Sequence, residues 1–279
     1  MLYHSKEHID AILRLEQECN ALEAIPYKAG IEHLAKENGD HGILCYQNNK
    51  MIGLLSWYAA DGSTARIDAR VHPHYRRQGA LRRMLLRALE DIAALGIRRL
   101  SYRMPRGSQA GIAAADSLGV TYERSEYVMT LRSSARTGLG ATDIRLRPGL
   151  PEDFEFMVAC VSQAFGDSES WTREYLTGTN DPSRLTYVAW KNGERVGLIR
   201  VNRLDEHTVV IHDFCVLPSL QGMGLGAQIL GQAVELLLAD SCREIRLGVV
   251  TDNERALNLY LRAGFEITAE NLYFIGGLG

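Results

Sequence analysis

An apolar segment, a glycine-rich turn and a helical pattern follow one another between residues 209 and 240, and this order constrains the fold more than any other feature. The segment Val209–Val216 has the composition of a buried strand, and the turn reads Gln221-Gly222-Met223-Gly224-Leu225-Gly226-Ala227. From Gln228 to Asp240, apolar residues recur at helical spacing. Such an arrangement holds phosphate, because unpaired backbone N–H groups of the turn and the positive end of the helix dipole face the ligand.

Three kinds of phosphate-binding loop compete for this turn. A P-loop needs Lys followed by Ser or Thr after the last glycine, whereas Ala227-Gln228 stands there. Gly222-x-Gly224-x-x-Ala227 satisfies the dinucleotide fingerprint, but in that unit the first glycine follows the strand almost directly, and here Pro218-Ser219-Leu220-Gln221 intervenes. The third kind is a coenzyme A loop. Val216-x-Pro218-x-x-Gln221-x-x-Gly224-x-Gly226 resembles the central motif of the GNAT acyltransferase superfamily at each diagnostic position.

A second segment supports this resemblance. Thr251-Asp252-Asn253-Glu254 has the spacing of a capping box that opens a helix, and Asn253-x-x-Ala256-x-x-Leu259-Tyr260-x-x-x-Gly264-Phe265 follows. The pattern is similar to that of the helix after the fifth strand in GNAT enzymes. In that family the Asn contacts the pantetheine arm of coenzyme A and the Tyr lies beside the thioester sulfur. Two matches in the correct order are more specific than either alone.

The resemblance implies acetyl-CoA as the co-substrate. The expected coenzyme contacts lie on the central strand, in the turn and on the later helix: Phe214, Cys215, Val216, Gln221, Gly222, Met223, Gly224, Leu225, Gly226, Ala227, Asn253 and Ala256. The resemblance implies that Tyr260 protonates the departing thiolate, and that backbone N–H groups of the central strand polarise the acetyl carbonyl. No Cys/His spacing resembles a metal site, so no metal is expected.

The same unit occurs twice in the chain. Four pairs of landmarks keep a nearly constant separation: Gly197 − Gly53 gives 144, and Val216 − Val71, Gly224 − Gly79 and Gly264 − Gly119 each give 145. Because insertions normally accumulate in loops, this agreement predicts a duplicated domain. We expect an N-terminal domain at 1–133, a small-residue linker at 134–142 and a C-terminal domain at 143–279. The predicted fold class is α/β (an α+β mixed sheet), with two tandem GNAT-fold domains, each a mostly antiparallel mixed sheet flanked by helices.

The two halves differ at the residues that carry the chemistry. In the first half Leu81 replaces the last glycine of the loop, and the place of Tyr260 is taken by Ala115. The corresponding helix shows no counterpart of Asn253 in clear register. We therefore expect a catalytic C-terminal domain and a degenerate N-terminal domain, in which the loop Arg76–Gly79 could still hold pyrophosphate.

The general base is expected on the central strand. Strict alternation places His212 on the same face as Phe214 and Val216, with Asp213 on the opposite face. In related acetyltransferases the base lies an even number of residues before the position of Val216, which favours His212, since an imidazole ordinarily titrates at about 6.5. A histidine that only bonds a loop is the competing interpretation, and Asp213 becomes a candidate base if a bulge reverses the alternation. The offset of 145 matches Asp213 with Asp68, which favours a structural role for this aspartate.

Composition narrows the range of partners. The 279 residues carry a formal net charge of −3, and the arginines between residues 66 and 106 alternate with acids, so nucleic acid is not expected. No apolar run approaches the ~20 residues that a bilayer requires, and the N-terminal residues lack a signal-peptide core, so we expect no membrane partner. Five scattered cysteines favour reduced thiols in the cytoplasm.

The sequence therefore predicts an acetyl-CoA-dependent N-acetyltransferase in which a primary amine attacks the thioester directly. Deprotonating a lysine-like ammonium of pKa ~10.4 at pH 7 costs roughly 4.6 kcal/mol, which explains the need for a base. The acceptor is a small-molecule or peptide amine of unassigned identity. The sequence leaves open whether the chain forms a homodimer. The alternative function is a non-catalytic acyl-CoA-binding regulatory or interaction module, against which the intact Gln221–Ala227 loop and Tyr260 both argue.

Overall fold

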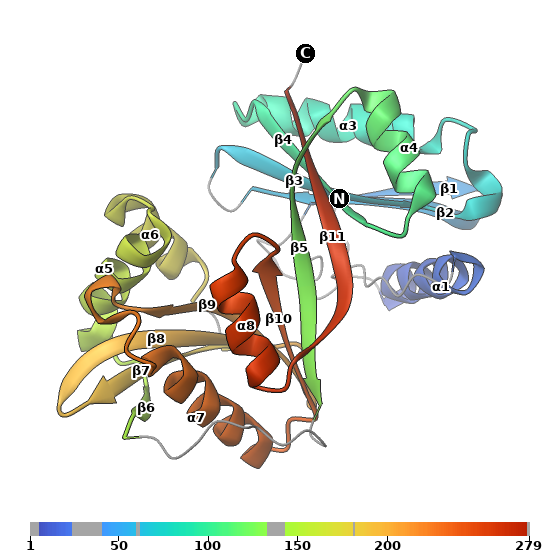
Figure 1. Ribbon diagram of the computed structural model, residues 1–279. Helices are drawn as coiled ribbons and strands as arrows, with labels where there is room; N and C mark the ends of the chain where they lie inside the picture. The colour runs from blue at the N-terminus through green and yellow to red at the C-terminus, as the bar shows by residue number, and fades with distance from the viewer. Residues whose placement is uncertain (1–5, 24–40, 60–61, 133–142, 181, 278–279) are drawn as a thin grey trace. The chain divides into compact units, whose positions relative to one another are not determined.

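The chain divides into two compact units. One comprises Met1–Ser125 together with Ala269–Gly279, and the other comprises Glu126–Thr268 (Figure 1). The computed structural model describes residues 6–23, 41–59, 62–132, 143–180 and 182–277. The expected linker at 134–142 lies outside these residues.

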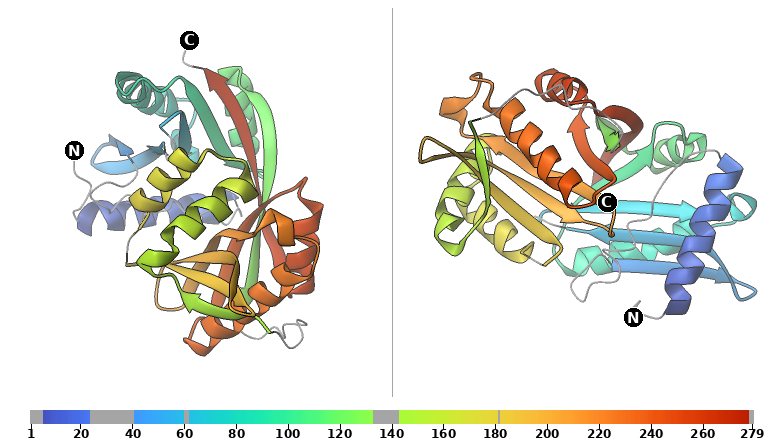
Figure 2. Two further views of the ribbon diagram at one scale, coloured as in Figure 1. Left: turned by 90° about the vertical axis from the view of Figure 1, so that its left-hand side faces the viewer. Right: turned by 90° about the horizontal axis from the view of Figure 1, so that it is seen from below.

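The first unit is a mixed sheet with helices on both faces (Figures 1 and 2). Its elements are α1 (Lys6–Glu23), β1 (His41–Gln47), β2 (Lys50–Tyr58), β3 (Thr64–Val71), η1 (Pro73–Tyr75), α3 (Ala80–Ala94), β4 (Arg99–Pro105), α4 (Gln109–Leu118) and the start of β5 (Thr121–Arg132). The strand order is β1-β2-β3-β4-β11, where β11 is Glu266–Gly277. Only β3 and β4 run parallel among these neighbours.

Two hydrophobic clusters cover the two faces of this sheet. Consecutive residues of β2 point to opposite faces, so that Leu55 packs in the cluster of α3 and Leu54 packs in that of α1. The contact residues on α3 include Met84 and Ile92. As a result β2 is buried along almost its entire length.

The last strand of the chain completes the sheet of the first unit. Asn271–Gly277 of β11 pairs antiparallel with Arg99–Pro105 of β4, and Leu272 is part of the cluster that contains α3. The expected C-terminal domain, 143–279, included this segment, and the pairing of β11 groups it with the first unit.

The second unit repeats the arrangement. Its elements are the end of β5, β6 (Arg145–Pro148), η2 (Pro151–Asp153), α5 (Phe154–Phe165), α6 (Glu169–Gly178), β7 (Arg184–Lys191), β8 (Glu194–Arg203), β9 (Thr208–Val216), η3 (Pro218–Leu220), α7 (Leu225–Ala239), β10 (Glu244–Val250), α8 (Glu254–Arg262) and the start of β11. The strand order is β5-β10-β9-β8-β7-β6, and only β9 and β10 are parallel. The predicted fold class, with mostly antiparallel mixed sheets flanked by helices, is confirmed.

The core of the second unit also lies on both faces of its sheet. Ile229 and Val234 of α7 pack with Val209 and Ile211 of β9 in one cluster. Val158 and Cys160 of α5 pack with Cys215 of β9 and Leu198 of β8 in a second cluster. The central strand β9 is therefore held between α7 and α5. Among the residues that the structure describes, no helix is long and apolar enough to cross a membrane.

Candidate functional site

The central strand β9 separates from its parallel neighbour halfway along its length. The ladder joins Thr208–Ile211 to Glu244–Leu247, and the later residues of β9 and β10, all of them described, form no further pairs with each other. Backbone groups of Phe214–Val216 that would face β10 are thus left for another partner. This is the stretch on which coenzyme contacts are expected.

A β-bulge lies in β9 at the same place. Leu198 of β8 pairs with Cys215, whereas Arg200 pairs with His212, so β9 carries one extra residue between these pairs. Asp213 lies in the bulge with a positive φ of 41°, a conformation that is uncommon for a residue with a side chain. The bulge changes which side chains share a face.

The faces of β9 therefore differ from those of a regular strand. Ladder partners share a face, so His212 lies on the face of Arg200, whose guanidinium contacts α6 through Tyr175. Phe214 and Val216 pack in the cluster of α7. The expectation that His212 shares a face with Phe214 and Val216 is wrong, because strict alternation takes no account of an inserted residue.

The first unit has no bulge in the corresponding strand. From Gly53–Val71 to Tyr58–Arg66 the pairing of β2 with β3 is continuous. Thr208 − Thr64 gives 144 at the start of the two strands, and Val216 − Val71 gives 145 at their ends. The offset rises by one because the bulge adds one residue to β9.

This register also changes the counterpart of Asp68. Asp68 and His212 each lie four residues after the first residue of their strand, before the bulge. Asp68 therefore corresponds to His212, and the expected match with Asp213 is wrong. In the first unit Asp68 accepts a hydrogen bond from Arg103 Nε at 3.0 Å.

A buried polar network holds the bulge. Asp213 Oδ2 accepts hydrogen bonds from Arg200 Nη1 at 2.9 Å and from the Tyr175 hydroxyl at 3.0 Å. Arg200, which is only 4% exposed, also donates to Thr179 Oγ1 at 3.0 Å and to Thr186 Oγ1 at 3.3 Å. Burial, followed by the negative charge of Asp213, raises the pKa of Tyr175 to about 12, so its phenol remains a donor. The network connects α6 to the bulge.

Cys215 follows the bulge and faces α5. Its Sγ lies 3.6 Å from that of Cys160, and both residues are buried. The hydrogen bond with Cys160 and burial raise the pKa of the Cys215 thiol well above its ordinary value. A thiol of this kind is a poor nucleophile, so Cys215 can serve the reaction only through its backbone.

The glycine-rich turn has the geometry of a phosphate cradle. Gly222 and Gly224 have φ values of 85° and 78°, and a Cβ on either would meet no heavy atom within 4 Å. The N–H groups of the first turn of α7, which begins at Leu225, have no acceptor within the helix. Gln221 Nε2 donates to the Val216 carbonyl at 3.2 Å and so ties the turn to the end of β9. The structure therefore gives Gln221 a structural role that the motif did not reveal.

In the first unit the equivalent turn is covered. Gly79 has a φ of 81°, but Arg83 Nη1 lies 3.4 Å from the place of its Cβ and donates to the Gln78 carbonyl at 3.2 Å. Arg76, a candidate pyrophosphate ligand, makes two hydrogen bonds to the Glu23 carboxylate at 2.8 and 2.7 Å. Both arginines are thus engaged within the protein.

Tyr260 lies on α8 and is 8% exposed. Its ring centroid is 6.5 Å from that of Phe214 and 6.0 Å from that of Phe265. Its hydroxyl has no hydrogen-bond partner in the described part of the chain. Burial raises the pKa of Tyr260 to about 12, so that the phenol carries its proton at neutral pH.

The remaining predicted coenzyme residues of this region lie in the turn and at the start of α7. A Cβ on Gly226 would lie 3.8 Å from the Phe214 ring and 3.5 Å from the Leu259 side chain, so the start of α7 lies next to Phe214 and α8. Leu225 is buried in the α7 cluster, Met223 is 66% exposed, and Ala227 is half-buried.

Helix α8 begins with a different cap from the one expected. Its N-cap is Asn253, whose Oδ1 accepts a hydrogen bond from the Ala256 N–H at 3.0 Å. The expected capping box from Thr251 to Glu254 is therefore wrong, because Asn253 itself supplies the capping oxygen. Its amide nitrogen has no acceptor among the described residues.

The first unit holds a clear counterpart of this cap. Ser108, at 253 − 145, is the N-cap of α4 and accepts from the Gly111 N–H at 3.1 Å. The expectation that no counterpart of Asn253 stands in register is wrong, because a serine satisfies the same backbone requirement. Ala115, in the place of Tyr260, is fully buried.

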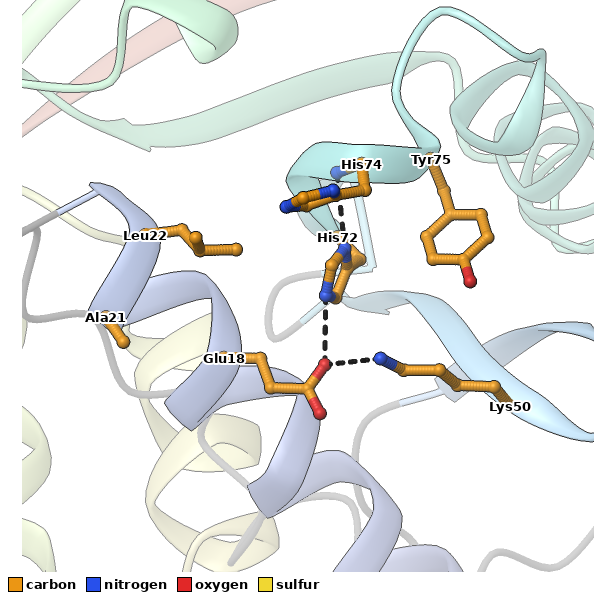
Figure 3. Close-up of a pocket in the computed structure, with 7 residues that line it drawn as sticks. All are labelled: Glu18, Ala21, Leu22, Lys50, His72, His74 and Tyr75. Carbon is orange, nitrogen blue, oxygen red and sulfur yellow. Dashed lines mark hydrogen bonds and ion pairs between the residues drawn. The ribbon is translucent and has the colours of Figure 1, made fainter.

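A second cluster, which the sequence did not indicate, lies in the first unit (Figure 3). It borders a cavity of about 480 Å³, in which Glu18 Oε2 meets His72 Nε2 at 2.9 Å and Lys50 Nζ at 2.7 Å. The His74 N–H donates to His72 Nδ1 at 3.2 Å. The hydrogen bond from Lys50 lowers the pKa of Glu18. These groups come from three separate elements, so no motif could reveal them, and their pairing attaches α1 to the sheet.

The described residues include no group of three or more His, Cys, Asp or Glu side chains that could hold a metal ion.

Comparison with known proteins gives a consistent result. The Acetyltransferase (GNAT) family matches residues 9–110 and 152–265. A protein named mycothiol acetyltransferase from Clavibacter sepedonicus is 27% identical over 219 residues, which are 73% of this chain and 70% of that protein. One with the same name from Paenarthrobacter aurescens is 30% identical over 216 residues, 71% of this chain and 66% of that protein.

Solved structures show the same fold. A GCN5-related N-acetyltransferase from Sphaerobacter thermophilus has a TM-score of 0.79 at 19% identity, with 96% of this chain and 91% of that chain covered. A tandem GNAT protein from the clavulanic acid biosynthesis pathway has a TM-score of 0.74 at 18% identity, with 100% and 97% covered. Since the family match falls on both halves and the folds agree over the whole length, the chain belongs to the GNAT acetyltransferase family as a tandem member.

Proposed function

We propose that the chain is an acetyl-CoA-dependent N-acetyltransferase whose second unit transfers the acetyl group directly to a primary amine. One combination of features carries the proposal. The end of β9 has no strand partner on the side of β10, and the open glycine turn at Gly222 and Gly224 follows it. The buried phenol of Tyr260, which has no hydrogen-bond partner among the described residues, lies beside Phe214 of the same strand. The first unit lacks the phenol and has Arg83 against its turn.

The residues of the second unit suit the coenzyme. N–H groups of the turn and of the first residues of α7 would bind the pyrophosphate. The amide nitrogen of Asn253 and the unpaired backbone of Phe214–Val216 would bind the pantetheine arm and the acetyl carbonyl. Acetyl-CoA supplies the activated acetyl thioester.

We assign proton donation to Tyr260. Full transfer of its proton to a thiolate of pKa ~8.5 would cost about 5 kcal/mol at 1.36 kcal/mol per unit, because burial raises the pKa of this phenol to about 12. The phenol would therefore act first as a hydrogen-bond donor to the sulfur as charge develops there. A buried hydrogen bond of this kind contributes to the rate without complete proton transfer.

We assign proton acceptance from the amine to His212, acting through water. His212 is half-buried and lies on the α6 side of the sheet, with Arg200 as its ladder partner. The neighbouring Asp213 is a weaker candidate, because its Oδ2 already accepts two hydrogen bonds. The acceptor would then approach from the α6 side.

Because two relatives are named mycothiol acetyltransferase, small thiol-bearing amines should be tested as acceptors, together with amino acids, aminoglycosides and peptides. We place the protein in the cytoplasm, where its five cysteines would stay reduced.

Thiol release from acetyl-CoA tests the proposal. The wild-type protein should release coenzyme A in the presence of at least one class of primary amine, and Tyr260→Phe should lower kcat by about 10²-fold while the Kd for acetyl-CoA is retained. Binding of acetyl-CoA without turnover of any amine would instead favour the non-catalytic acyl-CoA-binding module.

A further inference from the structure

Arg184, the first residue of β7, is a half-buried cation that has no counter-ion among the residues that the structure describes. Its Nε is buried and has no hydrogen-bond partner, and no ion pair or hydrogen bond of Arg184 occurs among the described residues. A buried guanidinium nitrogen without an acceptor lowers stability unless a ligand supplies one. By contrast, its neighbour on the same face, Arg200, forms an ion pair with Asp213.

The strand register places Arg184 on the face of the proposed base. Arg184 pairs with Asn202 of β8, and Asn202 pairs with Val210 of β9, two residues before His212. Paired residues share a face, as do residues two apart, so Arg184 and His212 lie on one face. They are separated by two strand spacings, about 10 Å, across the sheet and by about 7 Å along it. A small acceptor can bridge this separation once both side chains extend toward it.

On this face Arg184 has no paired carboxylate within the described part of the chain. Asp213 faces Arg200 and Tyr175, and its Oδ2 already accepts a hydrogen bond from each of them. The carboxylates of α6 itself, Glu169 and Glu174, are exposed. Burial raises the pKa of Tyr175 to about 12, and the charge of Arg184 opposes that rise, which places the guanidinium within electrostatic reach of α6. The stacked pair Trp171–Tyr175, with ring centroids 5.1 Å apart, stands on the same helix.

We propose that Arg184 is a specificity-determining residue, which binds a carboxylate carried by the acceptor. The inference rests on the proposed function and narrows its substrate class to primary amines that bear a carboxylate, such as free amino acids. Arg184 supplies a forked pair of N–H donors that matches a carboxylate in geometry. It orients the acceptor and takes no part in proton transfer.

Matched acceptors and variants test this assignment. We would measure kcat and KM for amino acids and for their carboxamides, with Arg184→Met, Arg184→Lys and the control Arg145→Met, which removes an exposed arginine of the same unit. Arg184→Met should raise KM for the acids by about 10- to 100-fold, with kcat changed little and the carboxamides unaffected. Arg184→Lys should recover part of the loss, and Arg145→Met should match the wild type. The inference would be overturned if Arg184→Met preferred the acids over the carboxamides as strongly as the wild type does.

Titration with N-acetylated amino acids and their amides separates this inference from the proposed function, because binding of these product analogues requires no turnover. Acids should bind the wild type and Arg145→Met but bind Arg184→Met at least tenfold more weakly, while the melting temperature of Arg184→Met should not fall below that of the wild type. If acids and amides bind alike in all variants, Arg184 is not a carboxylate site. Failure of acetyl-CoA to bind would refute the proposed function alone.

Discussion

Replacing Gly197 by alanine should damage the candidate site through the backbone of the bulged strand. A Cβ on Gly197 would stand 2.4 Å from the Cys215 carbonyl oxygen and 3.1 Å from the Cα of Val216, where ordinary contacts begin at 3.4 Å. One of the two strands must therefore move by about 1 Å. Overpacking costs about 1–3 kcal/mol, and we expect a value near 3 kcal/mol because the obstacle is backbone. The melting temperature of this unit should fall by roughly 6–12 °C.

Gly53→Ala is the matched control. Gly53 holds the equivalent place in the first unit, opposite Val71, and its Cβ would meet the flexible Met84 Cε at 2.9 Å. The methionine side chain can rotate away, and the Arg70 carbonyl oxygen at 3.3 Å is only slightly closer than an ordinary contact, so the loss should stay below about 1.5 kcal/mol. Thermal unfolding followed by acetyl-CoA titration measures both effects. The reasoning fails if Gly197→Ala melts and binds acetyl-CoA as Gly53→Ala does.

Three further outcomes follow from the ionisable groups. Since burial raises the pKa of Tyr260 to about 12, this phenol should cause no fall in kcat below about pH 10, and an alkaline limb near pH 9 that Tyr260→Phe removes would contradict the raised pKa. The hydrogen bonds from Arg76 lower the pKa of Glu23 from 4.5, so this pair stabilises the first unit above that pH and the effect is lost as pH falls through the lowered value. Arg76→Met also removes the hydrogen bond from Arg76 Nε to the Val71 carbonyl at 3.0 Å, which does not depend on pH. The loss of stability should therefore be about 1 kcal/mol larger at pH 7 than at about pH 2, with turnover unchanged, and a pH-independent loss in urea titrations would refute the pairing. Asp213→Asn should lower the free energy of unfolding by about 3 kcal/mol, because Arg200 then keeps a buried charge without its partner carboxylate. In a double-mutant cycle, a smaller loss when Asp213→Asn is combined with Arg200→Met would confirm the coupling, whereas additive losses would exclude it.

Much of the fold was predictable because local patterns agreed with it. The central strand was expected to end at Val216, where β9 ends, and the turn that follows contains the two glycines whose positive φ values the motif requires. The duplication was visible because loops between the matched elements kept their lengths.

The bulge was not predicted, although its trace was present. The offset changes from 144 at Gly197 to 145 at Val216, and a one-residue change inside a strand is what a bulge produces. Alternation cannot register such an insertion, and so it assigned His212 to the wrong face. The partner of β11 was equally hidden, because the pattern of a strand does not specify which sheet it joins.

The charged and polar contacts of the site could not be predicted from the sequence. Arg200, Asp213 and Tyr175 come from three elements that only the folded sheet brings together. The sequence gives no sign that Arg184 differs from other arginines at strand ends, because only the folded structure shows that its Nε has no partner among the described residues.

Calorimetric titration with acetyl-CoA tests the central claim most directly, namely that the second unit alone binds the co-substrate productively. We would compare the wild type with Gly224→Glu and Gly79→Glu, which place the same strained, negatively charged side chain in the two turns. We expect one site per chain, abolished by Gly224→Glu and retained in Gly79→Glu. A site that survives Gly224→Glu, or no binding to the wild type, would contradict it.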